Sequence, residues 1–103
     1  MKNSSFRIIY LPSAKQNLRE IALYLSQFYE NTFEKFMNQL DKSVSHLEEM
    51  PHMGMIYKDF RRLVVDDYLI FYKVDEKAQE VRIYRILHGS QNLDVKLVEL
   101  VDF

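Results

Sequence analysis

The sequence predicts an α+β domain in which two helices pack on one face of a small sheet. Three observations predict this: an aromatic and β-branched run near the N-terminus, two successive segments with apolar residues at helical spacing, and three β-rich runs that follow them. The length of 103 residues matches one ordinary domain. We therefore expect residues 1–103 to form a single domain around one core.

The first strand and the first helix are expected on either side of Pro12. Residues 6–11 are mostly aromatic and β-branched, which favours a strand, and Pro12 ends the run. Ser13 and Gln16 have the spacing of a capping box, which indicates that a helix begins there. The apolar residues that follow form one helical stripe: Leu18, Ile21, Ala22, Leu25 and Phe28.

A second helix is expected directly after the first. Asn31 and Glu34 repeat the capping arrangement, and a second apolar stripe runs to about Glu49. Its members are Phe33, Phe36, Met37, Leu40, Val44 and Leu47. Because the link between the two stripes is short, the helices should pack as a hairpin. Pro51 and Gly54 predict a loop after it.

The rest of the chain has the period of strands. Residues 61–65, 67–74 and 80–87 are β-rich and are separated by short polar segments. Tight connections of this kind join antiparallel neighbours, so the three runs predict an antiparallel meander. The helical hairpin is expected to cover one face of the sheet and to leave the other open. The spacing of Leu93, Leu97 and Leu100 predicts a short C-terminal helix.

Composition excludes several classes of protein. The apolar runs are far shorter than a membrane span, and the N-terminus has no signal-peptide pattern. The chain has no cysteine, which excludes disulfides and cysteine nucleophiles, and a cytoplasmic location is expected. A net charge of −1 provides no overall attraction for nucleic acid. Neither metal-ligand spacing nor a glycine-rich phosphate loop is present, so we expect no metal and no cofactor.

Side-chain alternation assigns the residues of the last two strands to faces. In the middle strand Tyr68, Ile70, Tyr72 and Val74 should share one face, and Leu69, Phe71 and Lys73 the other. In the last strand the corresponding sets are Val81, Ile83, Arg85 and Leu87, and Arg82, Tyr84, Ile86 and His88. Neither strand divides cleanly into core and solvent positions. The open face therefore either meets an apolar partner segment or is simply core at a sheet edge.

Two kinds of side chain could carry chemistry. His88 stands at a strand end before Gly89, where an imidazole is exposed and titratable, although a histidine there can equally be structural. Guanidinium groups match phosphate oxygens, and four arginines lie in the β-rich half: Arg61, Arg62, Arg82 and Arg85. The alternative for these arginines is salt bridging with nearby acids, namely Asp59, Asp66, Asp67 and Glu80.

Residues 60–74, with the sequence FRRLVVDDYLIFYKV, and residues 81–89, with the sequence VRIYRILHG, closely resemble the C-terminal half of the RelE/ParE family. The family consists of toxins of bacterial type II toxin–antitoxin systems. The opening strand that ends at Pro12, the first helix and the loop at residues 51–54 resemble the family more loosely. The resemblance implies a small toxin that a cognate antitoxin neutralises by laying a segment over its surface.

The family divides by target. RelE-like members cut messenger RNA on the ribosome, and ParE-like members poison DNA gyrase. Leu69 stands where the ribonuclease branch typically has arginine, and Ser90 and Gln91 stand where it has basic residues. The resemblance therefore favours a ParE-like inhibitor of DNA gyrase. The alternatives are a ribosome-dependent endoribonuclease and a toxin with weakened or lost activity, so enzymatic activity stays open and is disfavoured.

The resemblance also indicates which residues to inspect. If the chain is a ribonuclease, the best catalytic candidates are Arg62, Tyr72, Arg85 and His88. Tyr72 and Lys73 lie on opposite faces by alternation, so the polar side chains of this region cannot all converge. The candidates for binding the target or the antitoxin are Arg61, Arg62, Tyr68, Leu69, Phe71, Lys73, Tyr84, Arg85 and His88. The expected partners are an antitoxin, and gyrase or the ribosome as target.

Overall fold

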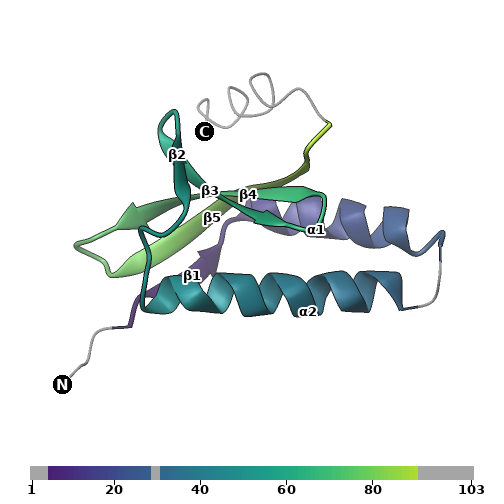
Figure 1. The fold of residues 1–103 in the computed structure, drawn as a ribbon, viewed down its shortest axis with the longest axis horizontal. Coiled ribbons are helices and arrows are strands. Elements are labelled where there is room, and N and C mark those ends of the chain that lie inside the picture. The colour runs from purple at the N-terminus through teal and green to yellow at the C-terminus, as the bar shows by residue number, and fades with distance from the viewer. Residues whose placement is uncertain (1–4, 29–30, 91–103) are drawn as a thin grey trace.

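The computed structural model describes residues 5–28 and 31–90, and the helix predicted at residues 93–101 lies outside them. The helices are α1 (Pro12–Leu25) and α2 (Thr32–Ser45), and a 3-10 turn (His46–Glu48) follows α2. The strands are β1 (Arg7–Tyr10), β2 (Met55–Tyr57), β3 (Phe60–Val65), β4 (Tyr68–Asp75) and β5 (Glu80–His88). Both helices lie on the same side of one sheet (Figure 1). The predicted α+β fold with a helical hairpin on one face is confirmed.

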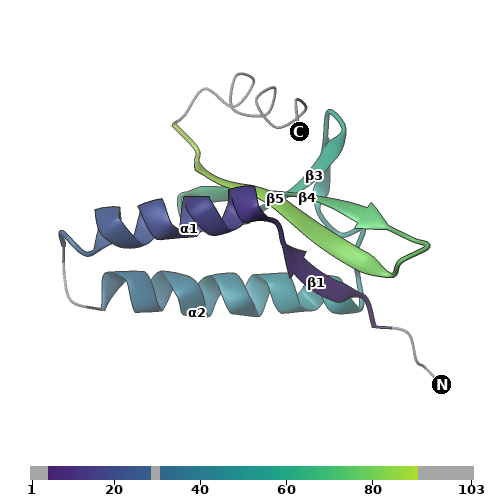
Figure 2. The same cartoon turned by 180° about the vertical axis from the view of Figure 1, so that it is seen from behind.

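The sheet contains the predicted meander and two further strands. Its order is β1-β5-β4-β3-β2, and β3, β4 and β5 are antiparallel neighbours as expected. The first strand pairs in parallel with the last, so β1 lies beside β5 (Figure 2). The short strand β2 pairs antiparallel with β3. A run of three residues is too short for a periodicity signal, which is why the sequence did not predict β2.

The first helix begins differently from the sequence prediction, whereas the second begins after Asn31 as expected. Leu11 is the N-cap of α1, and Pro12 occupies the first turn, where a missing N–H costs nothing. The Ser13 hydroxyl instead donates to the carbonyl oxygen of Tyr84 at 2.6 Å, which joins α1 to β5. Asn31 precedes α2 without a side-chain cap bond. Both predicted capping boxes are therefore wrong.

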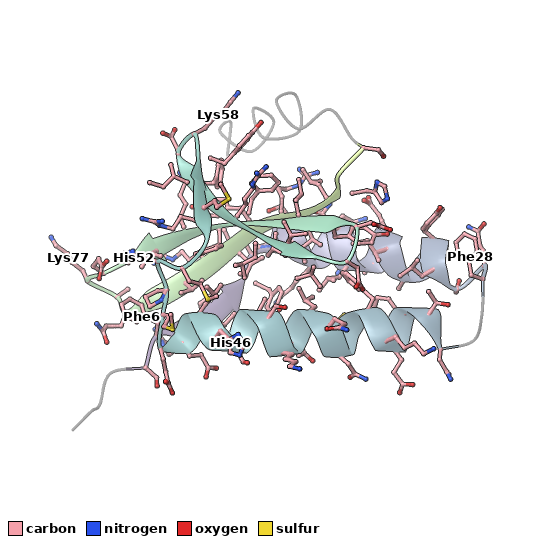
Figure 3. All side chains as sticks on the ribbon, viewed as in Figure 1. Phe6, Phe28, His46, His52, Lys58 and Lys77 are labelled. Atoms are coloured by element: carbon pink, nitrogen blue, oxygen red, sulfur yellow. The ribbon has the colours of Figure 1, made fainter. Side chains whose placement is uncertain are left out.

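The main core lies between the helices and the sheet. The helices contribute Ala14, Ile21, Phe36, Leu40 and Val44, and the sheet contributes Val65, Tyr68, Ile70, Tyr72, Val81, Ile83 and Ile86. Phe28 was predicted to extend the first stripe, but it follows the end of α1 and is 55% exposed. It lies at the far end of the helical hairpin (Figure 3). Neither described helix is long and apolar enough to cross a bilayer.

Tyr72 connects the core to the loop that precedes β2. Its hydroxyl donates to the carbonyl oxygen of Pro51 and accepts from the N–H of Gly54, both at 2.9 Å. A Cβ atom on Gly54 would lie 2.6 Å from this hydroxyl oxygen and 2.8 Å from the carbonyl oxygen of Arg62. The close approach explains why residue 54 is glycine. Burial is the main reason why the pKa of Tyr72 is raised.

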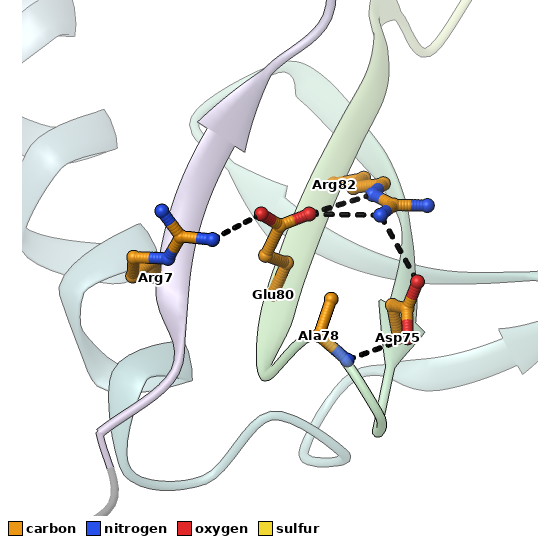
Figure 4. A network of polar contacts seen from close by, with 5 residues as sticks. All are labelled: Arg7, Asp75, Ala78, Glu80 and Arg82. Carbon is orange, nitrogen blue, oxygen red and sulfur yellow. Dashed lines mark hydrogen bonds and ion pairs between the residues drawn. The ribbon is translucent and has the colours of Figure 1, made fainter.

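A network of charged side chains fixes the turn between β4 and β5 to the edge strand (Figure 4). Arg7 of β1 pairs with Glu80, whose other carboxylate oxygen accepts from Arg82 at 2.8 and 3.0 Å. Arg82 also reaches Asp75 at 3.0 Å. The amide of Ala78 and then Arg82 lower the pKa of the Asp75 carboxyl. Of the four arginines considered above, Arg82 therefore follows the salt-bridge alternative.

Candidate functional site

The face of the sheet turned away from the helices was expected to be open and partly apolar, and it carries a second apolar cluster. We call it the second face, and it contains Phe60, Phe71 and Leu87, with Tyr57, Leu69 and Tyr84 packed against them. The first three side chains are buried. The ring centroid of Phe60 lies 6.2 Å from that of Phe71 and 5.4 Å from that of Tyr84. The second face is thus a connected aromatic surface.

Three cations lie over the rings of the second face, and the first is Lys58, whose ammonium is 5.9 Å from the ring centroid of Tyr57. The Lys73 ammonium is 4.9 Å from the ring centroid of Phe60 and 5.3 Å from that of Tyr84. The Arg62 guanidinium carbon is 5.5 Å from the ring centroid of Tyr57. Within the described part of the chain Arg62 and Lys73 form no ion pair. Positive charge beside aromatic rings suits the recognition of an acidic or aromatic partner.

A bulge in β5 changes which side chains share a face. Phe71 pairs with Arg85 and Tyr72 with Ile83, so Tyr84 is an extra residue in β5. Ile83 and Ile86 both face the helices, whereas Tyr84 and Leu87 belong to the second face. The predicted grouping of Val81, Ile83, Arg85 and Leu87 on one face is therefore wrong, because strict alternation fails at a bulge.

Arg85 is bonded to α1. Its Nε donates to Oδ1 of Asn17 at 3.0 Å, and the same oxygen accepts from the backbone N–H of Ile86 at 3.0 Å. Arg85 lines a cavity of about 330 Å³, which we call the Arg85 cleft. The other lining residues are Asn17, Glu20, Ile21, Tyr24, Tyr68, Ile86, His88 and Ser90.

His88 and Tyr68 form the outer wall of the Arg85 cleft. Their rings meet edge to face with centroids 5.3 Å apart, and Phe36 packs on the other side of Tyr68 at 4.9 Å. The backbone N–H of Ser90 donates to Nδ1 of His88 at 3.1 Å, and the Ser90 hydroxyl lies 2.8 Å from the same nitrogen. Burial, with contributions from Tyr24 and Asp67, raises the pKa of Tyr68. The Tyr68 hydroxyl therefore stays protonated at neutral pH.

The four catalytic candidates do not meet at one point. Arg85 and His88 line the same cleft, Arg62 lies on the second face, and Tyr72 is in the core with its hydroxyl bonded to the backbone at residues 51 and 54. Among the described residues no three His, Asp or Glu side chains gather closely enough to hold a metal ion.

The candidates for partner binding lie in two regions, except Arg61, which lies apart from both. Arg62, Leu69, Phe71, Lys73 and Tyr84 belong to the second face. Tyr68, Arg85 and His88 line the Arg85 cleft. Arg61 is separate, because its Nη1 donates to the carbonyl oxygens of His52 at 3.1 Å and Gly54 at 2.9 Å. Arg61 thus supports the loop before β2.

Sequence reasoning missed several residues of both regions. Asn17 is the one buried polar residue among those described, and Tyr24, Tyr57 and Phe60 complete the cleft and the second face. A signal for Asn17 was present, since it interrupts the apolar stripe between Ala14 and Ile21. A polar residue at such a position requires a hydrogen-bonding partner in the fold.

Solved structures identify the class of fold. The chain is similar to a toxin–antitoxin protein of the chromosomal ParDE system of P. aeruginosa, with a TM-score of 0.67 and 16% identity over 84% of this chain and 98% of that one. It is also similar to isolated E. coli RelE toxin, with a TM-score of 0.60 and 13% identity over 94% and 99% of the two chains. It is also similar to a chain of the RelBE2 toxin–antitoxin complex of Mycobacterium tuberculosis, with a TM-score of 0.57 and 12% identity over 82% of this chain and 98% of that one. The fold is that of the RelE/ParE toxins.

A family model that matches most of the chain identifies the family. Residues 8–93 match the model of the ParE toxin of the type II toxin–antitoxin system parDE. The chain belongs to this ParE toxin family, and the RelE/ParE resemblance is confirmed. A comparison with curated protein sequences finds no match.

Proposed function

We propose that this ParE-family toxin acts by binding a macromolecular target, with DNA gyrase as the favoured target, and that a cognate antitoxin neutralises it. The second face carries this proposal. It joins buried aromatic side chains to Arg62 and Lys73, whose cationic groups lie over the rings of Tyr57, Phe60 and Tyr84. Such a combination of rings and cations is typical of binding surfaces.

The chemistry of the second face supports binding over RNA cleavage. Leu69 and Phe71 occupy its centre, and neither side chain can stabilise a phosphorane or move a proton. Tyr72, which could supply a proton, is buried on the opposite side of the sheet. A phosphoryl-transfer site needs its acid, base and cation within hydrogen-bonding distance of one substrate, and the described residues of this face do not provide that set.

One observation favours the ribonuclease as the second candidate. Arg85 and His88 line a single cleft, and a guanidinium and an imidazole are a usable pair for phosphate chemistry. This pair lies on the side of α1, away from Arg62. The two candidate functions therefore depend on different side chains and can be separated by substitution.

The test begins with the chain expressed alone in a bacterium, with thymidine and leucine incorporation followed in the first minutes after induction. An early fall in thymidine incorporation is expected, with leucine incorporation falling later. Purified chain should then inhibit DNA supercoiling by gyrase. An early fall in leucine incorporation, with RNA ends that map to codons, would establish the ribonuclease instead. Unchanged incorporation of both labels would identify a toxin with weakened or lost activity.

Matched variants assign the effect to a surface. Lys73→Gln and Arg62→Gln should reduce gyrase inhibition, because each removes a cation from the second face. Lys77→Gln is the control, since Lys77 lies on the exposed turn between β4 and β5 and changes the net charge equally (Figure 3). Loss of toxicity in His88→Ala and Arg85→Ala, with the second-face variants still active, would contradict the binding proposal.

The antitoxin proposal rests on exposed apolar side chains near the end of α1. Leu23, Tyr24 and Phe28 are more than half exposed, and the rings of Tyr24 and Phe28 meet edge to face at 5.2 Å. A group of this kind on a small protein indicates a surface that a partner covers. Co-expression with the product of the adjacent small gene should give a stable complex with a higher melting temperature. A chain that neither binds that product nor gains thermal stability from it would refute the proposal.

A further inference from the structure

Asn17 fixes the orientation of the Arg85 guanidinium. Its Oδ1 accepts both from Nε of Arg85 and from the N–H of Ile86, the residue that follows the bulge. Asn17 itself is only 6% exposed. One buried amide therefore holds the bulged strand and the guanidinium together. An arginine fixed in this way loses little side-chain entropy when it binds a further group.

Part of the guanidinium of Arg85, which lines the cleft, is not used in this bond. Within residues 5–28 and 31–90 no acceptor is bonded to the Nη1 or Nη2 atoms of Arg85. These two nitrogens therefore offer a planar pair of donors toward a cavity of about 330 Å³. A carboxylate or a phosphate is the group whose oxygens match such a fork.

The charges around the cleft favour a carboxylate. Arg85 contributes one positive charge, and Glu20 contributes a carboxylate on the same lining. The Oε2 atom of Glu20 accepts from Nε2 of Gln16 at 3.2 Å, which holds the acid on the surface of α1. A phosphate carries more negative charge than a carboxylate and would be repelled more strongly by Glu20. Nucleic acid requires several cations along its backbone, and this cleft supplies one arginine.

The surroundings of the cleft favour a protein as the source of the carboxylate. Tyr24 lines the cleft and also contacts Phe28, and both rings are more than half exposed. Ile21 and Ile86 add apolar surface inside the cleft. A free small acid would leave this apolar surface uncovered. A segment with an acidic residue followed by apolar residues would use both the guanidinium and the rings.

We propose that the Arg85 cleft receives an aspartate or glutamate side chain of the antitoxin, with apolar residues of the same segment packed on Tyr24 and Phe28. The inference rests on the proposed function, because it names the contact by which the proposed antitoxin is held. It also assigns Arg85 to antitoxin binding and leaves target binding to the second face.

The experiment measures the affinity of the chain for the antitoxin encoded by the adjacent small gene. Arg85→Gln should weaken binding about 10- to 100-fold, as expected for the loss of a charge-assisted bidentate pair. Arg85→Lys should recover only part of this loss, because an ammonium keeps the charge without the fork. Arg82→Gln is the matched control, since Arg82 lies in the same strand and pairs with Glu80 and Asp75 outside the cleft. Its affinity should stay within about 2-fold of the wild type.

Two further measurements keep the inference testable if Arg85→Gln folds poorly. Glu20→Gln removes the negative charge of the lining and should tighten binding a few-fold. Replacing each Asp and Glu of the antitoxin by its amide should identify one position whose loss is non-additive with Glu20→Gln, because Glu20 repels only the acid that occupies the cleft. Additive losses at every acidic position would overturn the inference.

The outcomes separate the two proposals. A wild-type chain that fails to bind the antitoxin refutes the proposed partner and with it this contact. A wild-type chain that binds, with unchanged affinity in folded Arg85→Gln, overturns only the inference about the cleft. The last comparison measures how strongly inorganic phosphate and acetate, at equal concentration, compete with the antitoxin for binding. Stronger competition by phosphate in the wild-type chain, and not in Arg85→Gln, would overturn the assignment of a carboxylate.

Discussion

The two faces of the sheet differ in what their apolar side chains contact. On the helix side, Leu40 of α2 packs with sheet residues such as Ile70 and Ile83, and all three are fully buried. On the second face, the cluster around Phe60 and Phe71 is smaller and is bordered by cations. The helix side is built as an ordinary hydrophobic core. The second face combines a small apolar cluster with cations that lie over its rings.

This difference indicates where stability and function reside. A buried leucine contributes several kcal/mol through apolar transfer and close packing. A partly exposed cation over a ring contributes about 0.5–1 kcal/mol. Removing a charge from the second face should therefore leave the fold intact while it changes binding. The predictions below test this separation, from the largest expected effect to the smallest.

Leu40→Ala should give the largest loss of stability. The side chain is fully buried between α2 and the sheet, so truncation leaves a cavity and should cost about 2–5 kcal/mol. Val64→Ala is the contrast, since Val64 is 65% exposed on β3 and should cost less than about 0.5 kcal/mol. Urea unfolding of both variants measures the difference. Equal losses would show that the helix side is not the principal core.

Tyr72→Phe should give the next largest effect on the helix side. It leaves the aromatic ring in place but removes the hydroxyl that bonds the backbone of Pro51 and Gly54. Two backbone groups then lose their partner, which should cost about 1–3 kcal/mol. Amide exchange at Gly54 should accelerate in the same variant. Unchanged exchange would mean that water replaces the hydroxyl without loss.

The sequence predicted those parts of the fold that local patterns determine. The spacing of apolar residues by three and four positions predicted both helices. The β-rich runs with short turns between them predicted β3, β4 and β5. The parallel pairing of β1 with β5 was not predictable, because it joins residues far apart in the chain. The start of α1 was also mispredicted, since Ser13 bonds to Tyr84, a tertiary partner that no local pattern reveals.

The candidate site was predictable up to the bulge. Alternation correctly placed Phe71 and Lys73 on the face opposite Tyr72, because the extra residue lies in β5 and β4 itself is regular. In β5 one extra residue reverses the assignment of Ile86 and Leu87. Strict alternation of side chains assumes a regular strand and therefore cannot predict a bulge.

Lys73→Gln tests the second face directly. The ammonium lies over the rings of Phe60 and Tyr84 and is not needed to cover apolar surface in the main core. Its loss should change the free energy of unfolding by about 1 kcal/mol or less. Growth inhibition by the induced chain should nevertheless fall at least about 10-fold, the loss of one favourable contact at an interface centre. A loss of several kcal/mol in stability would place Lys73 among the residues that hold the fold.

The smallest expected effect is a loss of stability at alkaline pH, and it comes from Tyr10, which packs against the main core. Burial, and then Asp41, raise the pKa of Tyr10 to about 12, above its ordinary value of 10.0. Because the folded pKa is the higher one, the stability from neutral Tyr10 is complete below pH 10 and is lost as the pH rises toward 12. Tyr10 is only half-buried, so we expect a slope of about 0.5 kcal/mol per pH unit. Thermal unfolding across this range should show a shallower decline for Tyr10→Phe, with exposed Tyr24→Phe as the control. Identical declines in wild type and Tyr10→Phe would mean that Tyr10 titrates alike in the folded and unfolded chain.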